Sequence, residues 1–247
     1  MRVPSCEVLI VGAGPAGCAA AITGQRLGLN VVVVDKATFP RDKCCGDGLT
    51  TLALRELEQL GVHPTATRSW MEVSDIFLRS PRGKEIQLQL PQTRGQYAAV
   101  VERRELDAEL VQVAIDAGVE IRQGAAFQQI DIKEDGARVQ LQDGTIFSAK
   151  NVIAADGMWS PVRKALGCTP AGYRGDWHAF RQYFRADGKR SRKLWVWFEK
   201  DLLPGYAWSF PLQGDRVNVG FAVVRKEGMD GKQLAAIWDG LLHRPHL

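Results

Sequence analysis

The N-terminal segment constrains the fold of this chain more than any other. An apolar stretch over residues 6–11 leads directly into the pattern G-x-G-x-x-G, formed by Gly12, Gly14 and Gly17. An alanine-rich segment follows, and a second apolar run over residues 31–34 ends at Asp35. A strand, a glycine-rich turn, a helix and a second strand that ends in an acidic residue make up a dinucleotide-binding βαβ unit.

Each of these residue types has a physical role in such a unit. Gly12 permits the tight turn out of the strand, and Gly14 lets the backbone approach a pyrophosphate. Gly17 allows the helix to pack close to the strand, while the helix N-terminus presents its positive dipole end to the phosphates. We expect Asp35 to accept hydrogen bonds from ribose hydroxyls. An ordinary glycine-rich turn is the alternative, and the flanking strands and helix disfavour it.

The same segment partly resembles a secretory signal, because Arg2 precedes an apolar stretch that ends in alanines. Glu7, the turn glycines and Pro15 interrupt that stretch, so we expect no signal peptide. No uninterrupted apolar run approaches the roughly 18 residues that suggest a membrane span. The five cysteines are odd in number and lack the spacing of a disulfide framework, which favours the cytoplasm.

Composition narrows the class of protein. A chain of 247 residues with 45% hydrophobic and 24% charged residues is ordinary for a soluble globular protein. The formal charge of +4 is mild and no recognition motif is present, so we expect no nucleic-acid partner. No Cys/His spacing suggests a metal site. We interpret the basic run at residues 189–193 as a solvated loop, with peripheral contact to anionic lipid or to an acidic partner as the alternative.

Hydrophobic periodicity predicts how helices and strands alternate along the chain. Expected helices cover residues 50–61, 102–118, 160–166 and 229–241. A hairpin is expected over residues 73–90, a meander that ends in a buried strand at 151–155 is expected over 125–155, and strands dominate 177–224. The predicted fold class is therefore α/β, with a Rossmann-type domain (1–70 and 96–170) interleaved with a mostly antiparallel β-sheet substrate domain (71–95 and 171–247).

Four further segments carry chemical information. They are Lys43-Cys44-Cys45-Gly46-Asp47-Gly48, the pattern R-x-x-L-D that ends at Asp107, Ala155-Asp156-Gly157, and Tyr206-x-Trp208-x-Phe210-Pro211. Together with the opening turn they resemble the geranylgeranyl reductase family, whose members use FAD to saturate double bonds in prenyl chains. The resemblance extends from the first strand to about Ala222, and it implies an FAD-dependent oxidoreductase that acts on a prenyl lipid or a prenylated small molecule.

The resemblance also assigns roles to individual residues. The implied cofactor-binding residues are Gly12, Gly14, Ala16, Gly17, Asp35, Lys36, Cys45, Gly46, Gly48, Arg103, Ala126, Asp156 and Gly157. The implied substrate-binding residues are Tyr206, Trp208, Phe210, Pro211 and Gly220.

The chemistry suits these residue types, because an uncharged prenyl chain needs an apolar, aromatic pocket. Reduction also needs a proton, and a thiol or a phenol is mostly protonated at neutral pH. We expect Cys45 to donate it, with Tyr206, Cys44 and bound water as alternatives. No second G-x-G-x-x-G exists for a nicotinamide dinucleotide, so NADPH binding transiently or reduced ferredoxin would supply the electrons.

The chain departs from the family pattern in three places. Asp47 stands where many members have glycine, which brings a carboxylate into the expected flavin loop, and Ala222 replaces a glycine after the substrate motif. The sequence stops at Leu247, before the family's Gly-Asp segment. We therefore expect a truncated member with an incomplete substrate domain that retains FAD weakly. A fragment, a split protein complemented by a separate C-terminal chain and a degenerate copy are the three alternatives.

Two other functions remain open from the sequence. A flavin-dependent monooxygenase or halogenase on the same fold would require dioxygen, whereas a reductase would turn over without it. Halogenases carry the motif W-x-W-x-I-P, from which the segment at Tyr206–Pro211 differs in two residue types. A truncated, non-catalytic module that binds FAD or a prenyl chain would show no turnover even with added FAD.

Overall fold

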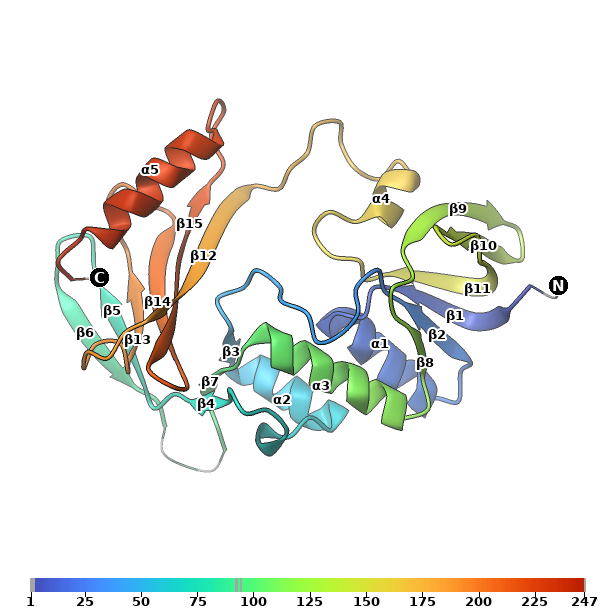
Figure 1. Ribbon diagram of the computed structural model, residues 1–247, viewed down its shortest axis with the longest axis horizontal. Helices are drawn as coiled ribbons and strands as arrows, with labels where there is room; N and C mark the ends of the chain where they lie inside the picture. Colours follow the sequence, from blue (N-terminus) through green and yellow to red (C-terminus); the bar gives the residue numbers. More distant parts are fainter. Residues whose placement is uncertain (1–2, 92, 94, 247) are drawn as a thin grey trace. The chain divides into compact units, whose positions relative to one another are not determined.

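The computed structural model describes residues 3–91, 93 and 95–246. It divides into two units, which are described separately. Unit 1 comprises Met1–Asp42, Glu56–Ala66 and Arg104–Arg174, and unit 2 comprises Lys43–Arg55, Thr67–Arg103 and Gly175–Leu247. Unit 1 carries a mainly parallel sheet with helices and unit 2 a mainly antiparallel sheet (Figure 1), so the predicted α/β class is confirmed.

The sheet of unit 1 has six strands, with parallel pairing on one side and antiparallel pairing on the other. In spatial order they are β8 (Glu120–Arg122), β2 (Val31–Val34), β1 (Ser5–Val11), β11 (Ile146–Ala154), β10 (Gly136–Leu141) and β9 (Phe127–Lys133). The strands from β8 to β11 are parallel, and β11, β10 and β9 form an antiparallel meander. The carboxyl ends of β1, β2 and β11 therefore meet at one edge of the sheet.

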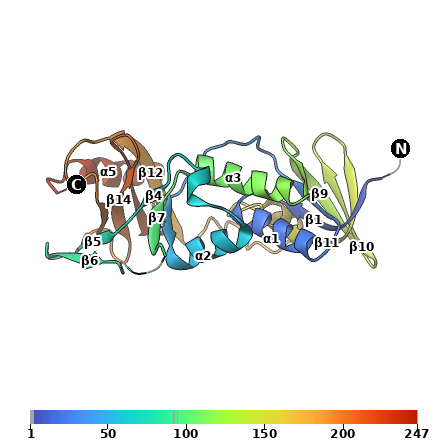
Figure 2. The same ribbon diagram turned by 90° about the horizontal axis from the view of Figure 1, so that it is seen from below.

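Helices accompany the parallel strands. Helix α1 (Pro15–Arg26) connects β1 to β2, and α3 (Arg103–Asp116) precedes β8. Figure 2 shows α1 and α3 running side by side. The guanidinium of Arg26 donates to the carbonyls of Gln59 and Leu60 at the end of α2 (Thr51–Leu60), which fastens α2 to α1. The helices expected over 50–61, 102–118 and 160–166 are confirmed, the last as the short α4 (Pro161–Ala165).

The core of unit 1 comes from the alternating apolar residues of its sheet. Leu9, Val34 and Phe147 are each at most 1% exposed, and they belong to one hydrophobic cluster. The strand expected at 151–155 is present, but the expectation that it is buried is wrong. These residues continue β11, but Ile153 is 40% exposed, because α1 packs on β1 and β2 rather than on this end of β11.

Unit 2 is built on a second six-stranded sheet. Its spatial order is β12 (Trp177–Arg185), β15 (Arg216–Val224), β14 (Tyr206–Leu212), β13 (Leu194–Trp197), β5 (Asp75–Arg79) and β6 (Glu85–Gln89). All neighbours are antiparallel except β13 and β5. A small sheet of β3 (Gly48–Thr50), β7 (Ala98–Val100) and β4 (Met71–Glu72) follows the loop at residues 43–47. The hairpin expected over residues 73–90 is confirmed.

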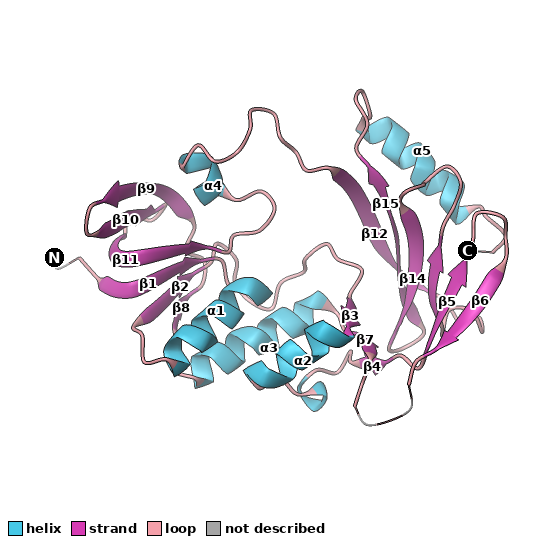
Figure 3. Cartoon of the chain, turned by 180° about the vertical axis from the view of Figure 1, so that it is seen from behind, coloured by secondary structure: helices cyan, strands magenta, loops and turns pink. Residues whose placement is uncertain are grey.

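The two faces of this sheet differ. Helix α5 (Gly231–Leu242) lies along one face (Figure 3), where the Trp238 ring packs against Phe180 and Phe221. Asp230 and Gln233 begin α5 with reciprocal capping hydrogen bonds. Because side chains alternate along a strand, the opposite face carries Tyr183 of β12, Trp208 of β14 and Asn218 of β15.

The two units differ from the expected domain bounds in four segments. Residues 43–55, 67–70 and 96–103, expected in the Rossmann-type domain, lie in unit 2, and residues 171–174, expected in the substrate domain, lie in unit 1. Within the described part of the chain, each helix is too short or too polar to cross a bilayer.

Candidate functional site

The glycine-rich turn of unit 1 is packed so closely that two of its glycines are required. Gly12 has φ +107°, and a Cβ there would lie 2.4 Å from the Ala155 carbonyl oxygen. A Cβ on Gly17 would lie 1.8 Å from the Gly12 carbonyl oxygen. These contacts show why the turn uses glycine at both positions: the first enters the left-handed region and the second lets α1 approach the strand.

Gly14 is different, because open space faces it. The nearest atom to a Cβ built on Gly14 is a guanidinium nitrogen of Arg41, 3.8 Å away. Arg41 donates to Asp107 at 2.7 Å, and the Asp107 side chain is 0% exposed. A helix N-terminus, an open approach to the backbone and a held guanidinium form an environment suited to a pyrophosphate.

Asp35 directly follows β2, and its carboxylate holds the glycine-rich turn next to the end of that strand. Its Oδ2 accepts a hydrogen bond from Ala13 N–H at 2.7 Å, and its Oδ1 accepts one from Ala37 N–H at 2.7 Å. Each carboxylate oxygen has a further lone pair, so the bracing is compatible with the predicted contact to ribose. Ala125 N–H donates to the Asp35 carbonyl at 2.7 Å, which places Ala126 next to this strand end.

Asp156 supplies a second polar group at the same sheet edge. Its Oδ2 accepts from Val162 N–H at 3.0 Å, at the start of α4. Its Oδ1 is buried and has no hydrogen-bond partner among the described residues. An orphaned carboxylate oxygen beside a glycine turn needs a donor that the chain itself does not provide. The hydroxyl groups of a bound dinucleotide would provide one, so the residues of unit 1 fit an FAD.

The two buried cysteines of this unit are not reactive groups. Burial raises the pKa of Cys6 to about 11 and that of Cys18 to about 12. The Cys18 thiol donates to the Ala13 carbonyl inside the turn. Both therefore serve as small packing residues, since a thiol needs its thiolate form to react.

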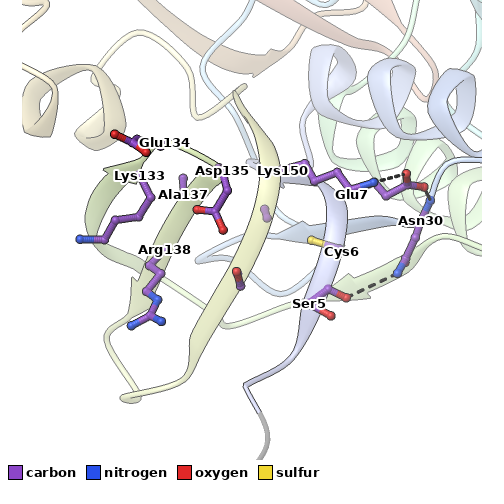
Figure 4. Close-up of a pocket in the computed structure, with 13 residues that line it drawn as sticks. Ser5, Cys6, Glu7, Asn30, Lys133, Glu134, Asp135, Ala137, Arg138 and Lys150 are labelled. Carbon is purple, nitrogen blue, oxygen red and sulfur yellow. Dashed lines mark hydrogen bonds and ion pairs between the residues drawn. The ribbon is translucent and has the colours of Figure 1, made fainter.

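One cavity of unit 1 lies elsewhere. It has a volume of about 780 Å³ and is lined from β1, β10 and β11 by residues such as Ser5, Arg138 and Lys150 (Figure 4). Ser5 begins β1, whereas the glycine turn follows the opposite end of that strand. Ligands of open α/β sheets bind at the carboxyl ends of the strands, so this cavity is not the dinucleotide site.

Unit 2 carries the other predicted residues, grouped around the aromatic motif on β14. The rings of Tyr206 and Trp208 lie 5.9 Å apart, and those of Trp208 and Phe210 lie 6.2 Å apart, between centroids. The expectation that these three lie on one face of the sheet is confirmed. Pro211 pairs in register with Val217 and alternates to the other face, so the structure separates it from the three rings.

Three glycines allow close packing around this motif. A Cβ on Gly220, which pairs with Trp208 in the sheet, would lie 2.3 Å from the Trp208 ring. A Cβ on Gly48 would lie 2.9 Å from the Phe210 ring, and one on Gly46 would lie 3.3 Å from it. The cysteine-glycine loop and the aromatic motif, far apart in sequence, are thus one packed unit.

Asp47 lies at the centre of that loop and is 1% exposed, with φ +65°. Its Oδ2 accepts from the Tyr183 hydroxyl at 2.7 Å and from Asn218 Nδ2 at 2.7 Å, and its Oδ1 accepts from Arg103 N–H at 3.3 Å. Burial raises the pKa of Asp47, and these hydrogen bonds together with the positive charge of Arg181 partly offset the rise. The carboxylate expected in the flavin loop is therefore satisfied by donors of unit 2 itself.

Asn218 joins the loop to the aromatic motif. Its Nδ2 also donates to the Cys45 carbonyl at 2.8 Å, and its Oδ1 accepts from the Trp208 indole N–H at 3.1 Å. The side chain of Cys45 is half-buried in the loop, and Tyr206 is 38% exposed.

The predicted site residues thus fall into two groups. Unit 1 brings together Gly12, Gly14, Ala16, Gly17, Asp35, Lys36, Ala126, Asp156 and Gly157, and unit 2 holds Cys45, Gly46, Gly48, Arg103, Tyr206, Trp208, Phe210 and Gly220. The roles assigned to them remain predictions.

Sequence reasoning missed four residues, which are Arg41, Asp107, Tyr183 and Asn218. Two signals were present: Asp107 closes the R-x-x-L-D pattern, and Asn218 interrupts an apolar strand. Arg41 and Tyr183 carried no comparable signal.

Comparison with known proteins identifies relatives of the whole described chain. The model of the FAD binding domain family matches residues 5–234. Menaquinone reductase of Mycobacterium tuberculosis is 37% identical, over 87% of this chain and 54% of that protein. Digeranylgeranylglycerophospholipid reductase 1 of Methanopyrus kandleri is 30% identical, over 97% of this chain and 63% of that protein. The chain therefore spans between half and two thirds of the length of these curated relatives.

Solved structures share the fold. A geranylgeranyl bacteriochlorophyll reductase-like protein of Thermoplasma acidophilum superimposes with a TM-score of 0.82 at 24% identity, covering 99% of this chain and 64% of that one. The myxobacterial halogenase CndH superimposes with a TM-score of 0.77 at 19% identity, covering 98% of this chain and 58% of that one. The resemblance to geranylgeranyl reductases is confirmed by the named relatives, while these structural similarities show the fold alone.

Proposed function

Because the chain belongs to the FAD binding domain family, we propose that it is the cofactor- and substrate-binding part of an FAD-dependent reductase that saturates carbon–carbon double bonds of a prenyl chain. The observation that carries this proposal is the packing of the Cys45 loop onto the Trp208 and Phe210 rings. Cys45 directly precedes the packed Gly46, so a residue with a thiol and a row of aromatic rings belong to the same packed unit. This chemistry suits an uncharged alkene.

The residues of unit 1 would hold the cofactor. The Gly12–Gly17 turn and the N-terminus of α1 receive the pyrophosphate, with Arg41 as an added positive charge. Asp35 and the orphaned Oδ1 of Asp156 accept hydrogen bonds from hydroxyl groups. When bound and reduced, FAD supplies the hydride equivalent for the reduction, and NADPH or reduced ferredoxin restores it.

The residues of unit 2 would act on the substrate. Trp208 and Phe210 contact the prenyl chain and exclude water from the double bond. The Cys45 thiol delivers the proton to the second carbon of that bond, with Tyr206 as the alternative donor. The relatives named above act on a quinone and on a glycerophospholipid, so the group that carries the prenyl chain is either a quinone ring or a lipid headgroup.

Two arms of one experiment separate these substrates. Purified protein is supplied with FAD and dithionite in the absence of dioxygen, and then with menaquinone or with a geranylgeranylated glycerophospholipid. Air then reoxidises any quinol to the quinone, so that only a saturated chain keeps added hydrogen. We expect mass spectrometry to show one pair of hydrogen atoms gained per saturated bond in one arm. The proposal fails if bound, reduced flavin leaves both substrates unchanged, or if a product forms only with dioxygen and contains new oxygen.

The fold is also that of monooxygenases and halogenases, as the CndH comparison shows. The sequence favours the reductase, because Phe210 and Tyr206 stand where the halogenase motif has isoleucine and tryptophan. Dependence on dioxygen in the same assay decides between the two.

The place of the protein in the cell belongs to the same proposal. We propose that it works in the cytoplasm and touches a membrane peripherally while it takes up a prenyl lipid. The basic residues 189–193 are the candidate surface for anionic headgroups, although Arg190 also pairs with Glu85.

A further inference from the structure

The buried amide of Asn218 has a role that the proposed reduction does not yet include. Resting on that proposed function, we propose that Asn218 is a positioning residue. Its single side chain holds the Cys45 backbone and the Trp208 indole in one arrangement, so the proton donor and the wall of the prenyl site keep a common geometry.

The hydrogen bonds of Asn218 permit only one orientation of its amide. An indole N–H can only donate, so the group facing Trp208 must be the carbonyl oxygen, at 3.1 Å. The other end faces the Cys45 carbonyl at 2.8 Å and the Asp47 carboxyl at 2.7 Å, both of which accept. Both amide hydrogens and the oxygen are thus used, in a side chain that is 0% exposed.

A second anchor fixes the loop on the other side of Gly46. The Asp47 carboxyl accepts from the Tyr183 hydroxyl, and its carbonyl accepts from Val101 N–H at 2.9 Å. The Arg181 guanidinium lies over the Tyr183 ring, 4.2 Å from its centroid. The loop is therefore not free to rotate about one contact, because Asn218 holds Cys45 and Tyr183 holds Asp47, on either side of Gly46.

The packing of the glycines couples the loop to the rings. Gly46 and Gly48 contact Trp208 and Phe210 so closely that even a methyl group would press on the rings. A displacement of the loop would therefore displace the rings with it. Loss of the Asn218 amide is expected to loosen Cys45 and Trp208 together, which loss of packing alone would not do.

Two readouts test this without turnover. In a Cys44→Ser, Cys168→Ser background Cys45 is the one cysteine of the five that is not buried, so its rate of alkylation by iodoacetamide reports the loop. The indole N–H resonance of Trp208, assigned with Trp208→Phe, reports the ring. We expect Asn218→Leu, which keeps the branching and the number of side-chain heavy atoms, to change the alkylation rate by about fivefold, the factor that loss of one typical hydrogen bond gives. The indole resonance is expected to shift in the same variant.

Val217→Ala is the matched control. Val217 precedes Asn218 on β15 and is buried, but its side chain lies on the opposite face of the sheet. It should lower the melting temperature and leave both readouts as in the wild type. If Asn218→Leu does not fold, Tyr183→Phe removes only the hydroxyl that holds Asp47 and should shift the same two readouts less.

Turnover supplies the third readout. Asn218→Leu should lower kcat for the prenyl substrate. The inference is overturned if the alkylation rate and the indole resonance stay at their wild-type values in Asn218→Leu, or if Val217→Ala moves them equally. A wild-type chain that reduces no prenyl substrate would overturn the proposed function alone, since the two physical readouts still decide whether Asn218 couples the loop to Trp208.

Discussion

At the scale of single residues, the cysteines differ by where the fold places them. Cys45 and Cys168 both have thiols that solvent reaches, but only Cys45 belongs to the loop packed on Trp208. We expect Cys45→Ser to lower kcat for the prenyl substrate about 10²-fold or more, the usual contribution of a positioned proton donor. Steady-state kinetics measures this, with FAD affinity as the check on folding.

Cys168→Ser is the control for that substitution and should retain wild-type turnover. Full activity in Cys45→Ser would contradict the assignment of the proton donor. If Tyr206→Phe alone then loses activity, the phenol takes the place of the thiol.

Asp47 gives a prediction about pH. Its pKa is raised in the folded protein by burial, so the folded chain binds this proton more tightly than the unfolded chain does. The stability that this proton contributes is full below about pH 4, the ordinary value of an aspartate, and is lost as the pH rises through the raised pKa. Asp47→Asn cannot ionise and removes this loss.

Urea unfolding at several pH values checks the prediction. As the pH rises from about 4 to about 7, the unfolding free energy of Asp47→Asn should increase relative to that of the wild type, which means that the variant becomes comparatively more stable. A difference between the two proteins that is independent of pH would contradict it.

The residues of unit 2 show how far sequence reasoning reaches. Trp208 and Gly46 were identified because they stand in recognisable motifs. Asn218 was not, because its partners lie up to 173 positions away along the chain, and no local pattern encodes such a contact. A lone asparagine between valines on a strand of alternating apolar residues was the available signal, since a buried amide requires partners.

At the scale of elements, the glycines between β1 and α1 serve different purposes, since one is needed for folding and another leaves space for a ligand. Gly12 is required by the chain itself, whereas the space beside Gly14 is open. We expect Gly14→Ala to keep the unfolding free energy of the protein without FAD within about 0.5 kcal/mol of the wild type. It should raise the dissociation constant for FAD at least about tenfold, because the new methyl group occupies the approach to the pyrophosphate.

Gly12→Ala is the contrasting variant, and it should destabilise the protein without FAD by about 1–3 kcal/mol. Calorimetry with FAD and denaturant titration without it separate the two effects. Equal FAD affinity in Gly14→Ala and the wild type would contradict the placement of the cofactor.

Substitution of two glycines of unit 2 by alanine should change the stability of the protein in opposite directions. Gly220→Ala would press a methyl group on the Trp208 ring and on the Phe180 carbonyl, and should destabilise by about 1–3 kcal/mol. Gly240 lies in α5 with nothing within 4 Å of a built Cβ, so Gly240→Ala should stabilise by about 0.5 kcal/mol. Thermal unfolding measures both, and destabilisation by Gly240→Ala would show that the space around that residue is wrongly described.

Hydrophobic periodicity predicts most helices and strands, but it does not predict the burial or the pairing of all of them. The helices α2, α3 and α5 and the β5–β6 hairpin were predictable, because their apolar spacing and turn residues are local. The exposure of Ile153 was not, since it depends on which strands α1 covers. The parallel pairing of β13 with β5 joins segments more than one hundred residues apart, and nothing near either strand indicates it.

At the scale of the whole molecule, the chain combines two kinds of site. Unit 1 offers a glycine turn, a helix N-terminus and an orphaned carboxylate oxygen, which suit a dinucleotide. Unit 2 offers aromatic rings on one face of an antiparallel sheet and a cysteine in the loop that packs on those rings, which suit an apolar alkene. A flavin reductase of prenyl chains needs a site of each kind, and the sequence motifs by themselves indicate both sites.

The central claim is that the cofactor held by unit 1 reduces a prenyl chain held by unit 2, and the half-reaction tests it most directly. The protein is loaded with FAD, reduced with a stoichiometric amount of dithionite and mixed with a prenyl lipid that carries no quinone ring, in the strict absence of dioxygen, while flavin absorbance is followed. The account predicts that the absorbance of oxidised flavin returns in proportion to the substrate added, and that it returns more slowly in Cys45→Ser. Flavin that binds but stays reduced until dioxygen is admitted would contradict the claim.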